Sequence, residues 1–415
     1  MHAHFVVIAL AIFAAAPAFA LDAPLTLEQA QRLAVERSRQ LEAQSLAIGA
    51  SRDMAVAAGQ RPDPVVSIGV ENLPVEGPDR FSIARDFMTM RRIGISQELT
   101  RRDKRELRAE RYELEAVKGL AEQELSRAAI RRDAAIAWLD AWHAEAMAAL
   151  IADQRVRGLQ EVEASEAEYR AGRGTQSDAL MARAGLAMLD DRAAEIERRI
   201  RSARAMLVRW TGVDAKQPLG PRPALSVADL HEHALDDLLA GHPQIAVFTR
   251  QEAVASADAR LASANKKPDW TVGLAYSVRG SAFGDMVSIG VSVPLPWDQA
   301  NRQDREVSAK LAAVGQAQAL REEALRQHVA ETRAMLDEWR INQGRITRYE
   351  REIIPLASAR AEAALAAYRG GKSGINEVLA ARRLELDARF QALQLEAENA
   401  RAWAQLAYFL PEMSK

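Results

Sequence analysis

Four short segments of the chain alternate between apolar residues and small or polar residues. Valine, isoleucine, leucine, tryptophan or tyrosine recurs at every second position, and glycine, serine, alanine or threonine fills most positions between them. A period of two places successive side chains on opposite faces of a β-strand, so each segment is predicted to be a strand with one apolar face. The segments are 65–73 (VVSIGVENL), 91–99 (RRIGISQEL), 270–278 (WTVGLAYSV) and 287–295 (VSIGVSVPL).

Two kinds of sheet fit this alternation. The apolar face covers the core of a soluble domain, or it faces lipid in a membrane barrel whose small, polar face lines a lumen. Trp270 begins one strand and Trp297 follows the next, so both rings are expected at one end of a hairpin, where barrels carry interfacial aromatics. Membrane barrels have about eight strands or more. Four strands per chain therefore predict that a barrel would be shared among subunits.

Long helices are predicted around the strands. Residues 103–168 contain no proline and have a continuous helical pattern, which at about 1.5 Å per residue gives a helix of about 100 Å. A second long helix is expected over 303–367, with a kink at Pro355, because proline cannot donate a backbone hydrogen bond. Apolar residues at a spacing of seven predict coiled-coil-like packing of the first helix; they are Leu107, Leu114, Ala121, Ala128, Ala135, Trp142, Ala149 and Val156.

The chain contains an internal duplication. The segment AEYRAGRGTQSDALMAR (167–183) parallels AAYRGGKSGINEVLAAR (366–382), and the register continues without a gap to Trp210 and Phe409. Each copy has the order helix, two strands, long helix, helix. The predicted organisation is a first repeat at 21–215, a Pro-rich linker at 216–223, a second repeat at 224–411 and a tail at 412–415.

The duplicated glycines raise the question of a phosphate-binding loop. Gly371-Lys372-Ser373 matches the end of that motif, but Ala366 replaces its first glycine and the preceding segment is helical. The motif requires a strand before it and a helix after it. Because glycine adopts positive φ without strain, we interpret 169–173 and 368–372 as the turns of two helical hairpins.

Composition excludes several classes of function. The 55 basic and 57 acidic residues give a net charge of −2, which does not suggest a nucleic-acid partner. The absence of cysteine excludes disulfides, thiolate metal sites and N-terminal lipidation. No catalytic motif occurs, so neither an enzyme activity nor a cofactor is expected. The histidines at 231, 233 and 242 lack the spacing of a metal site and are expected to be solvated at the surface.

The N-terminal residues predict export. Residues 5–16 are apolar, and Ala18-Phe19-Ala20 matches an A-x-A cleavage site, so 1–20 is interpreted as a cleaved signal peptide. The rest of the chain has no apolar run of about 20 residues, the length that a membrane-spanning helix needs. The expected locations are the periplasm, the cell surface or an outer-membrane barrel.

These features together resemble the TolC family of outer-membrane efflux channels. The resemblance covers nearly the whole mature chain, and its most specific marks are Tyr169-x-x-Gly172, Tyr368-x-x-Gly371, ISQEL (95–99) and SVPLPWDQANRQDRE (292–306). The compact length and VENLP (70–74) resemble the CzcC-like members, which serve heavy-metal pumps of the resistance-nodulation-division type. The implied fold is mainly α with a small membrane β part: a homotrimer with one twelve-stranded barrel, continued by a long helical tunnel in the periplasm.

The resemblance also implies a role and partners. The chain would be the passive exit duct of a tripartite efflux pump in the outer membrane, joined by a periplasmic adaptor (membrane fusion protein) to an inner-membrane resistance-nodulation-division pump. Heavy-metal cations are a candidate cargo. One alternative is the same fold in a protein or peptide secretion system. An alternative of another class is a soluble periplasmic coiled-coil scaffold or adaptor.

Candidate functional residues follow from the duplicated tips and the strand ends. In the family, a carboxylate near Asp178 and Glu377 lines the tunnel entrance; the alternative is that both acids complement a helix dipole. Trp270 and Trp297 are the expected lipid-interface aromatics. The expected tip-turn and adaptor-contact residues are Tyr169, Arg170, Gly172, Arg173, Tyr368, Arg369, Gly371 and Lys372, although the glycines and tyrosines also fit a purely structural role in turn and packing.

Overall fold

The computed structural model describes residues 23–225 and 235–409, which form two compact units. Among the described residues, the hairpin unit comprises 23–37, 131–225 and 339–404; the strand unit comprises 38–130, 235–338 and 405–409. Each unit takes segments from both predicted repeats. The predicted signal peptide, His231, His233 and the tail lie outside the described residues.

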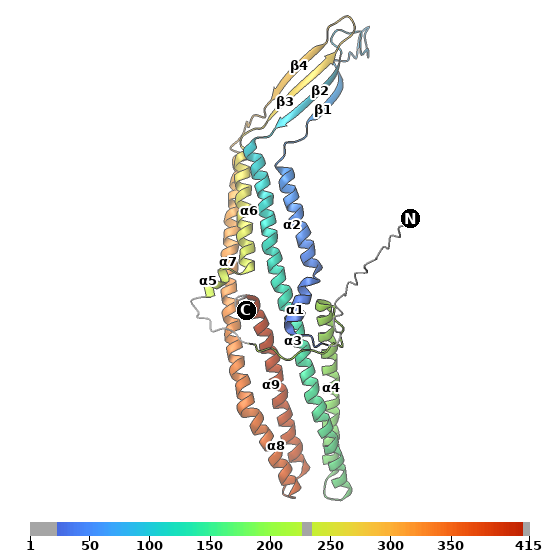
Figure 1. The fold of residues 1–415 in the computed structure, drawn as a ribbon, viewed down its shortest axis with the longest axis vertical. Helices are drawn as coiled ribbons and strands as arrows, with labels where there is room; N and C mark the ends of the chain where they lie inside the picture. Colours follow the sequence, from blue (N-terminus) through green and yellow to red (C-terminus); the bar gives the residue numbers. More distant parts are fainter. Residues whose placement is uncertain (1–22, 226–234, 410–415) are drawn as a thin grey trace, which may run out of the picture. The chain divides into compact units, whose positions relative to one another are not determined.

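The strand unit contains neighbouring long helices and a sheet (Figure 1). Its main elements are α2 (Arg39–Ala58), β1 (Val65–Glu71), β2 (Met90–Leu99), the first part of α3 (Arg102–Arg170), α5 (Leu235–Ala240), α6 (Pro243–Asn265), β3 (Trp270–Val278), β4 (Met286–Ser292) and most of α7 (Gln303–Arg348). Asp258 on α6 accepts hydrogen bonds from Arg111 on α3 at 2.7 Å and from Lys310 on α7 at 3.3 Å. This carboxylate therefore links three of the helices.

The alternation predicted four strands, and the described residues contain them in one antiparallel sheet with the order β1-β2-β3-β4. The register places Ser67, Gly94, Ala275 and Ser288 in one row across the sheet. Apolar side chains occupy the opposite face and remain exposed; Ile68 is 81% and Ile289 is 77% exposed. The apolar face thus covers no core within the described residues, unlike the sheet of a soluble domain.

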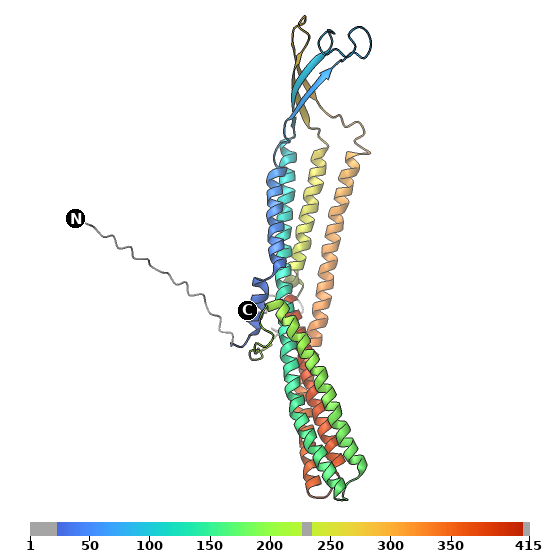
Figure 2. The same ribbon diagram turned by 90° about the vertical axis from the view of Figure 1, so that its right-hand side faces the viewer.

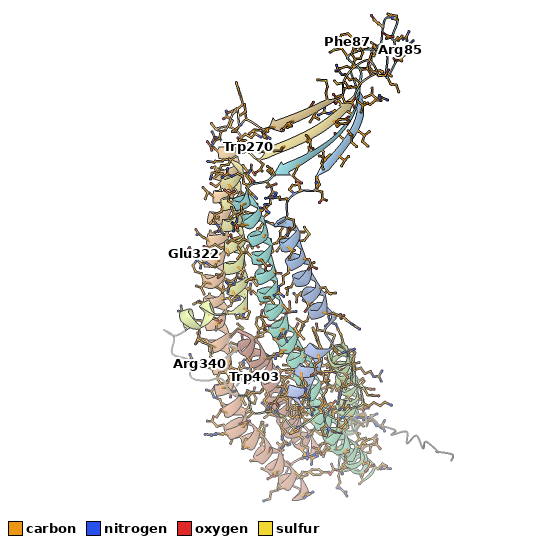
Figure 3. The ribbon with its side chains drawn as sticks, turned by 45° about the horizontal axis from the view of Figure 1, so that its top comes forward. Arg85, Phe87, Trp270, Glu322, Arg340 and Trp403 are labelled. Atoms are coloured by element: carbon orange, nitrogen blue, oxygen red, sulfur yellow. The ribbon has the colours of Figure 1, made fainter. Side chains whose placement is uncertain are left out.

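Loops lie beyond one end of this sheet, and two tryptophans lie at the other. Phe87 and Phe283 come from the loops that follow β1 and β3, and their ring centroids are 6.4 Å apart. Figure 3 shows Phe87 and Arg85 in the loop region and Trp270 where β3 begins, next to the helices. Trp297, which follows β4, is 94% exposed. Both tryptophans are therefore accessible near the helix-side end of the sheet.

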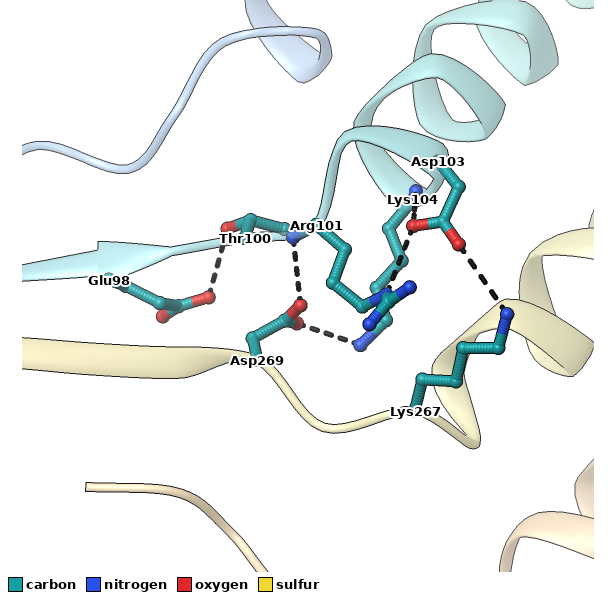
Figure 4. A network of polar contacts seen from close by, with 7 residues as sticks. All are labelled: Glu98, Thr100, Arg101, Asp103, Lys104, Lys267 and Asp269. Carbon is teal, nitrogen blue, oxygen red and sulfur yellow. Dashed lines mark hydrogen bonds and ion pairs between the residues drawn. The ribbon is translucent and has the colours of Figure 1, made fainter. Parts of the chain in front are cut away.

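A buried ion pair connects strands to helices (Figure 4). The Lys104 side chain on α3 is only 5% exposed, and its Nζ lies 2.8 Å from Asp269 Oδ2, just before β3. Asp269 Oδ1 also accepts a hydrogen bond from the Arg101 backbone N–H at 3.0 Å. A buried ammonium group is costly unless it is paired and hydrogen-bonded. This pairing fixes the point at which β3 approaches the start of α3.

The hairpin unit contains α1 (Leu27–Glu36), the second part of α3, α4 (Gln176–Thr211), α8 (Ile354–Arg369) and α9 (Ile375–Phe409) up to residue 404, and Figure 2 shows its long helices running side by side. Near Pro355, where a kink was predicted, the regular α-helix is interrupted. A five-residue π-helix, Tyr349–Ile353, precedes α8, and Ile354 N–H donates to the Tyr349 carbonyl. Proline cannot donate to the carbonyl four residues earlier and its ring crowds that group, so the preceding turn widens.

The predicted stripe on α3 is buried only in part. Ala135 is buried and Trp142 packs against the same core cluster, whereas Ala149 and Val156 are exposed. Residues two positions further along share the spacing of seven and continue the buried face toward the tip: Ala137, Ala144, Ile151, Gly158 and Ser165. Alanine is frequent on every side of this helix, so the sequence does not select the phase of the stripe.

The core of the hairpin unit surrounds Trp138. This side chain is fully buried, and its Nε1–H donates to the Leu25 carbonyl at 2.8 Å. Ala30 on α1, Leu207 on α4 and Ala400 on α9 belong to the same buried cluster. The cluster therefore joins α3, α4, α9 and the N-terminal segment around one large aromatic ring. Among the described helices, none combines the length and the apolarity needed to cross a membrane.

His143 lies on α3 two residues after Ala141, a member of this cluster, and is 2% exposed. Neither ring nitrogen has a hydrogen-bond partner in the described part of the chain. Burial lowers the pKa of His143 to about 4, and the charges of Arg222 and Arg401 act in the same direction. The imidazole is therefore neutral in the folded chain at neutral pH.

Acid is expected to destabilise the hairpin unit through His143. Below its ordinary pKa of about 6.5 the unfolded chain binds a proton, whereas the folded chain does not until about pH 4. The stability present above pH 6.5 is then lost progressively as the pH falls, by on the order of 3 kcal/mol at most. Urea unfolding followed by tryptophan fluorescence checks this, and His143→Leu should flatten the pH dependence between 4.5 and 6.5. An equal dependence in both proteins would contradict it.

His242 corrects another prediction, because it is buried rather than solvated. It is the N-cap of α6, where its Nδ1 accepts a hydrogen bond from the Gln244 N–H at 3.2 Å. Its ring packs edge-on against His328 and Tyr408, with centroids 4.9 and 5.3 Å away. Burial and the neighbouring His328 lower the pKa of His242 to about 4. His242 therefore caps α6 from a buried position in the strand unit.

Candidate functional site at the helix tips

The first hairpin tip reverses the chain between α3 and α4. Gly172 has φ +72°, and its N–H donates to the Tyr169 carbonyl at 3.1 Å. Only glycine adopts this conformation without strain. Thr175 then caps α4: its hydroxyl accepts from the Asp178 N–H at 3.2 Å, and Asp178 Oδ2 accepts from the Thr175 N–H at 2.9 Å. Asp178 therefore belongs to a capping box.

The second tip, between α8 and α9, repeats the turn but not the cap. Gly371 has φ +68°, and its N–H donates to the Tyr368 carbonyl at 2.9 Å. Gly374 occupies the position equivalent to Thr175 and offers no hydroxyl. Glu377 is exposed. Asp178 and Glu377 align in the two repeats, but among the described residues only Asp178 makes the hydrogen bonds of a capping box.

Polar contacts connect the two hairpins, and the one farthest from the tips joins Arg401 on α9 to Asp140 on α3 at 2.6 Å. Tyr368 donates a hydrogen bond to Glu168, and Asn376 donates to Asp178. Farther from the tips, Arg382 bonds Glu161 at 2.8 Å and Arg192 bonds Asp387 at 3.2 Å. The pKa of Tyr368 is raised by burial and by its bond to Glu168. The pKa of Asp178 is lowered, mainly by the Thr175 backbone N–H and then by the Thr175 hydroxyl and Asn376.

The structure brings together only part of the predicted tip set. Asp178 and Tyr368 take part in contacts between the hairpins, whereas Tyr169 is 48% exposed. The predicted basic tip residues are all exposed: Arg170, Arg173, Arg369 and Lys372. Sequence reasoning missed the partners Glu161, Glu168, Asn376 and Asp387. The sequence carried a signal for Glu168 alone, because this residue directly precedes Tyr169, one of the two repeated tyrosines.

A groove of about 770 Å³ lies among α3, α4 and α9 in the same unit. Small or apolar residues line much of it, including Gly158, Ala182, Gly185 and Leu186. Both ion pairs, Arg382–Glu161 and Arg192–Asp387, contribute residues to the lining. The two hairpins therefore contact each other through polar groups, next to a groove that is lined largely by small side chains.

Comparison with known proteins relates the fold of the chain to that of outer-membrane channels. Residues 234–410 match the family described as "Outer membrane efflux protein". No curated protein matches the chain at a significant level. Among solved structures, the outer-membrane channel OprN has a TM-score of 0.78 at 20% identity, covering 92% of this chain and 89% of that one.

Two further structures give the same result. CusC, whose structures concern folding and transmembrane channel formation, has a TM-score of 0.77 at 16% identity over 92% of this chain and 91% of that one. The outer membrane protein VceC from Vibrio cholerae has a TM-score of 0.75 at 18% identity over 92% and 95%. The chain thus has the fold of outer-membrane channels, and its second half matches the outer membrane efflux protein family.

Proposed function

We propose that this protein is the outer-membrane exit duct of a tripartite efflux pump. Three copies form one barrel of twelve strands, and their helices form a tunnel in the periplasm. A periplasmic adaptor joins the duct to an inner-membrane pump of the resistance-nodulation-division type, which supplies the energy. The duct itself is passive, and heavy-metal cations are the proposed cargo, as in the CzcC-like members that the sequence resembles.

The observation that carries this proposal is the exposed sheet. Its central apolar residues have no covering element in the described chain, and its outer strands β1 and β4 each have one unpaired edge. Exposed edges and a continuous apolar face are aggregation hazards in water. Both are resolved when β1 of one copy pairs with β4 of the next in lipid, because closure removes the edges and lipid covers the apolar face.

The small row Ser67, Gly94, Ala275 and Ser288 then faces the lumen. An added Cβ at Gly94 would lie 2.9 Å from Ser67 Oγ and 3.3 Å from Ala275 Cβ, so the strands are closely packed on this face. Trp270 and Trp297 lie at the level of the lipid interface in this arrangement. The hairpin tips form the tunnel entrance, where the contacts between hairpins hold a narrow state and the exposed basic residues contact the adaptor.

Membrane fractionation tests the proposal. The full protein should stay in the outer membrane after a high-salt wash, require detergent for release and give a three-chain product on cross-linking in detergent. A soluble scaffold or adaptor would appear in the periplasmic fraction instead. Recovery of a monomer in that fraction, without detergent, would refute the channel.

Neutralising the two tip acids is expected to weaken cation selectivity. In the trimer, Asp178 and Glu377 form a ring of six carboxylates at the entrance, which concentrates cations. Asp178→Asn/Glu377→Gln should lower the cation-to-anion permeability ratio by about two- to fivefold, measured from reversal potentials in planar bilayers. The matched control is Glu163→Gln/Glu362→Gln, an exposed pair at equivalent positions of the two repeats. Equal ratios in both double variants would remove the tip acids from the conduction path.

A further inference from the structure

The helix-side end of the sheet carries two exposed cations beside its apolar face. Leu99 and Trp270 form the last pair of the β2–β3 ladder, and both are exposed on that face. Arg101 follows β2 and Lys267 precedes β3, so the cations belong to the connections that join these strands to α3 and α6. Their side chains are 43% and 61% exposed. An apolar surface therefore ends next to two accessible positive charges.

The two cations share one carboxylate, and neither contact is short. Arg101 Nε lies 3.4 Å from Asp103 Oδ1, and Lys267 Nζ lies 3.9 Å from Asp103 Oδ2 (Figure 4). Charge-assisted hydrogen bonds between such groups are usually about 2.7–2.9 Å long. Arg101 and Lys267 are therefore only loosely paired, and together they have a single negative charge between them.

The other acids of this junction do not neutralise the pair. Asp269 accepts from the buried Lys104 at 2.8 Å. Glu98 precedes Leu99 in β2, so its side chain lies on the opposite face of the sheet, where it accepts from the Thr100 hydroxyl at 3.1 Å. Of the residues in Figure 4 other than Glu98, three are cations and two are acids, which leaves one excess positive charge; they are Arg101, Lys104, Lys267, Asp103 and Asp269.

We propose that Arg101 and Lys267 bind the phosphate of an anionic phospholipid in the periplasmic leaflet of the outer membrane. The inference rests on the proposed function, which puts the apolar face of the sheet in lipid. The acyl chains lie along that face, above Leu99 and Trp270. Each copy supplies both cations from its own chain, so a trimer has three equal sites.

The chemistry of the site favours a headgroup with a net negative charge. A phosphodiester carries one negative charge and accepts hydrogen bonds from both a guanidinium and an ammonium group. It therefore supplies the one charge that the junction lacks. A zwitterionic headgroup adds its own ammonium group next to two cations and brings no net charge. The Trp270 ring fits the same position, because indole is favoured where apolar and polar layers of a membrane meet.

Quenching of tryptophan fluorescence by brominated lipids tests the site. The full protein, extracted as a trimer, is reconstituted in phosphatidylcholine vesicles that contain increasing fractions of brominated phosphatidylglycerol or brominated phosphatidylcholine. Trp270→Phe identifies the part of the signal that comes from this position. The anionic lipid should quench that part at a lower fraction. Arg101→Gln/Lys267→Gln should reduce its relative affinity by roughly thirtyfold, or about fivefold for each charge.

The matched control is Arg102→Gln/Lys266→Gln. These cations adjoin the other two in sequence, but each has a carboxylate of its own: Glu106 lies 2.7 Å from Arg102, and Asp304 lies 2.7 Å from Lys266. The control removes the same charge and should keep most of the preference for the anionic lipid. An equal loss in both double variants would show a diffuse attraction to the membrane surface and would overturn the site.

A second variant covers a failure of the double variant to fold. Asp103 begins α3, and its Oδ1 accepts from the Lys104 backbone N–H at 3.0 Å. Asp103→Asn retains an oxygen that can accept this bond but removes the charge that Arg101 and Lys267 share. The preference for brominated phosphatidylglycerol should then rise severalfold. An unchanged or weaker preference in the folded trimer would contradict the proposal.

The outcomes separate this inference from the proposed function. If the protein inserts as a trimer but both lipids quench it equally, the channel stands and the phospholipid site is wrong. If the protein is recovered without detergent as a periplasmic monomer, its apolar face does not meet lipid, and the site is wrong together with the channel.

Discussion

Ile289→Lys is expected to keep the protein out of the outer membrane. Ile289 is the central residue of β4, and its side chain is 77% exposed on the apolar face of the sheet. A lysine at the middle of a lipid-facing strand costs roughly 2–4 kcal/mol in a membrane barrel. In the proposed trimer, three such residues would cost roughly 6–12 kcal/mol together, which is comparable to the whole usual stability of about 5–15 kcal/mol. Outer-membrane yield after a salt wash and the fraction of trimer in detergent measure the loss.

Ser288→Lys is the matched control for this change. Ser288 is adjacent in β4 but lies on the opposite face, in register with Ala275. Its substituent enters the proposed lumen, where water solvates the charge, so most of the protein should still reach the membrane. The expected difference is a near-complete loss for Ile289→Lys against a modest loss for Ser288→Lys. Equal insertion of both would show that the apolar face does not contact lipid.

Trp138→Ala is expected to destabilise the hairpin unit by about 3–5 kcal/mol, the range for truncation of a large buried aromatic. The ring is fully buried, and the groups around it come from α1, α3, α4 and α9. Its loss leaves a cavity and removes the donor to the Leu25 carbonyl. Because α3, α4 and α9 also carry the tips, the contacts between hairpins should weaken as well. Urea unfolding, with hydrogen exchange of α1 and α4, measures both effects.

Trp138→Phe separates packing from hydrogen bonding. Phenylalanine retains much of the apolar volume but cannot donate to the Leu25 carbonyl. A buried carbonyl left without a donor lowers the free energy of unfolding by about 1–3 kcal/mol. The expected order of stability is wild type, then Trp138→Phe, then Trp138→Ala. A Trp138→Ala variant as stable as the phenylalanine variant would mean that the site collapses without a cavity, contrary to the role given to this ring.

Local patterns in the sequence determined the secondary structure closely. The alternation in 65–73, 91–99, 270–278 and 287–295 predicted all four strands of the described sheet, and the helical pattern over 103–168 predicted α3. Gly172 and Gly371 predicted the tips, because a positive φ is a property of the residue itself. Pro355 predicted an irregularity in its helix, because proline has no backbone N–H to donate. These features depend on residues within a turn or two of each other.

The tertiary structure alone decided which residues meet. Lys104 and Asp269 are 165 positions apart, and Asn376 and Asp178 are 198 apart; on helices with many charges, nothing local marks one charge as the partner of another. The buried stripe of α3 and the burial of His143 and His242 were likewise decided by packing. Alanine is tolerated on buried and exposed faces alike, so an alanine-rich sequence specifies a helix without specifying its orientation, and only the neighbouring helices select it.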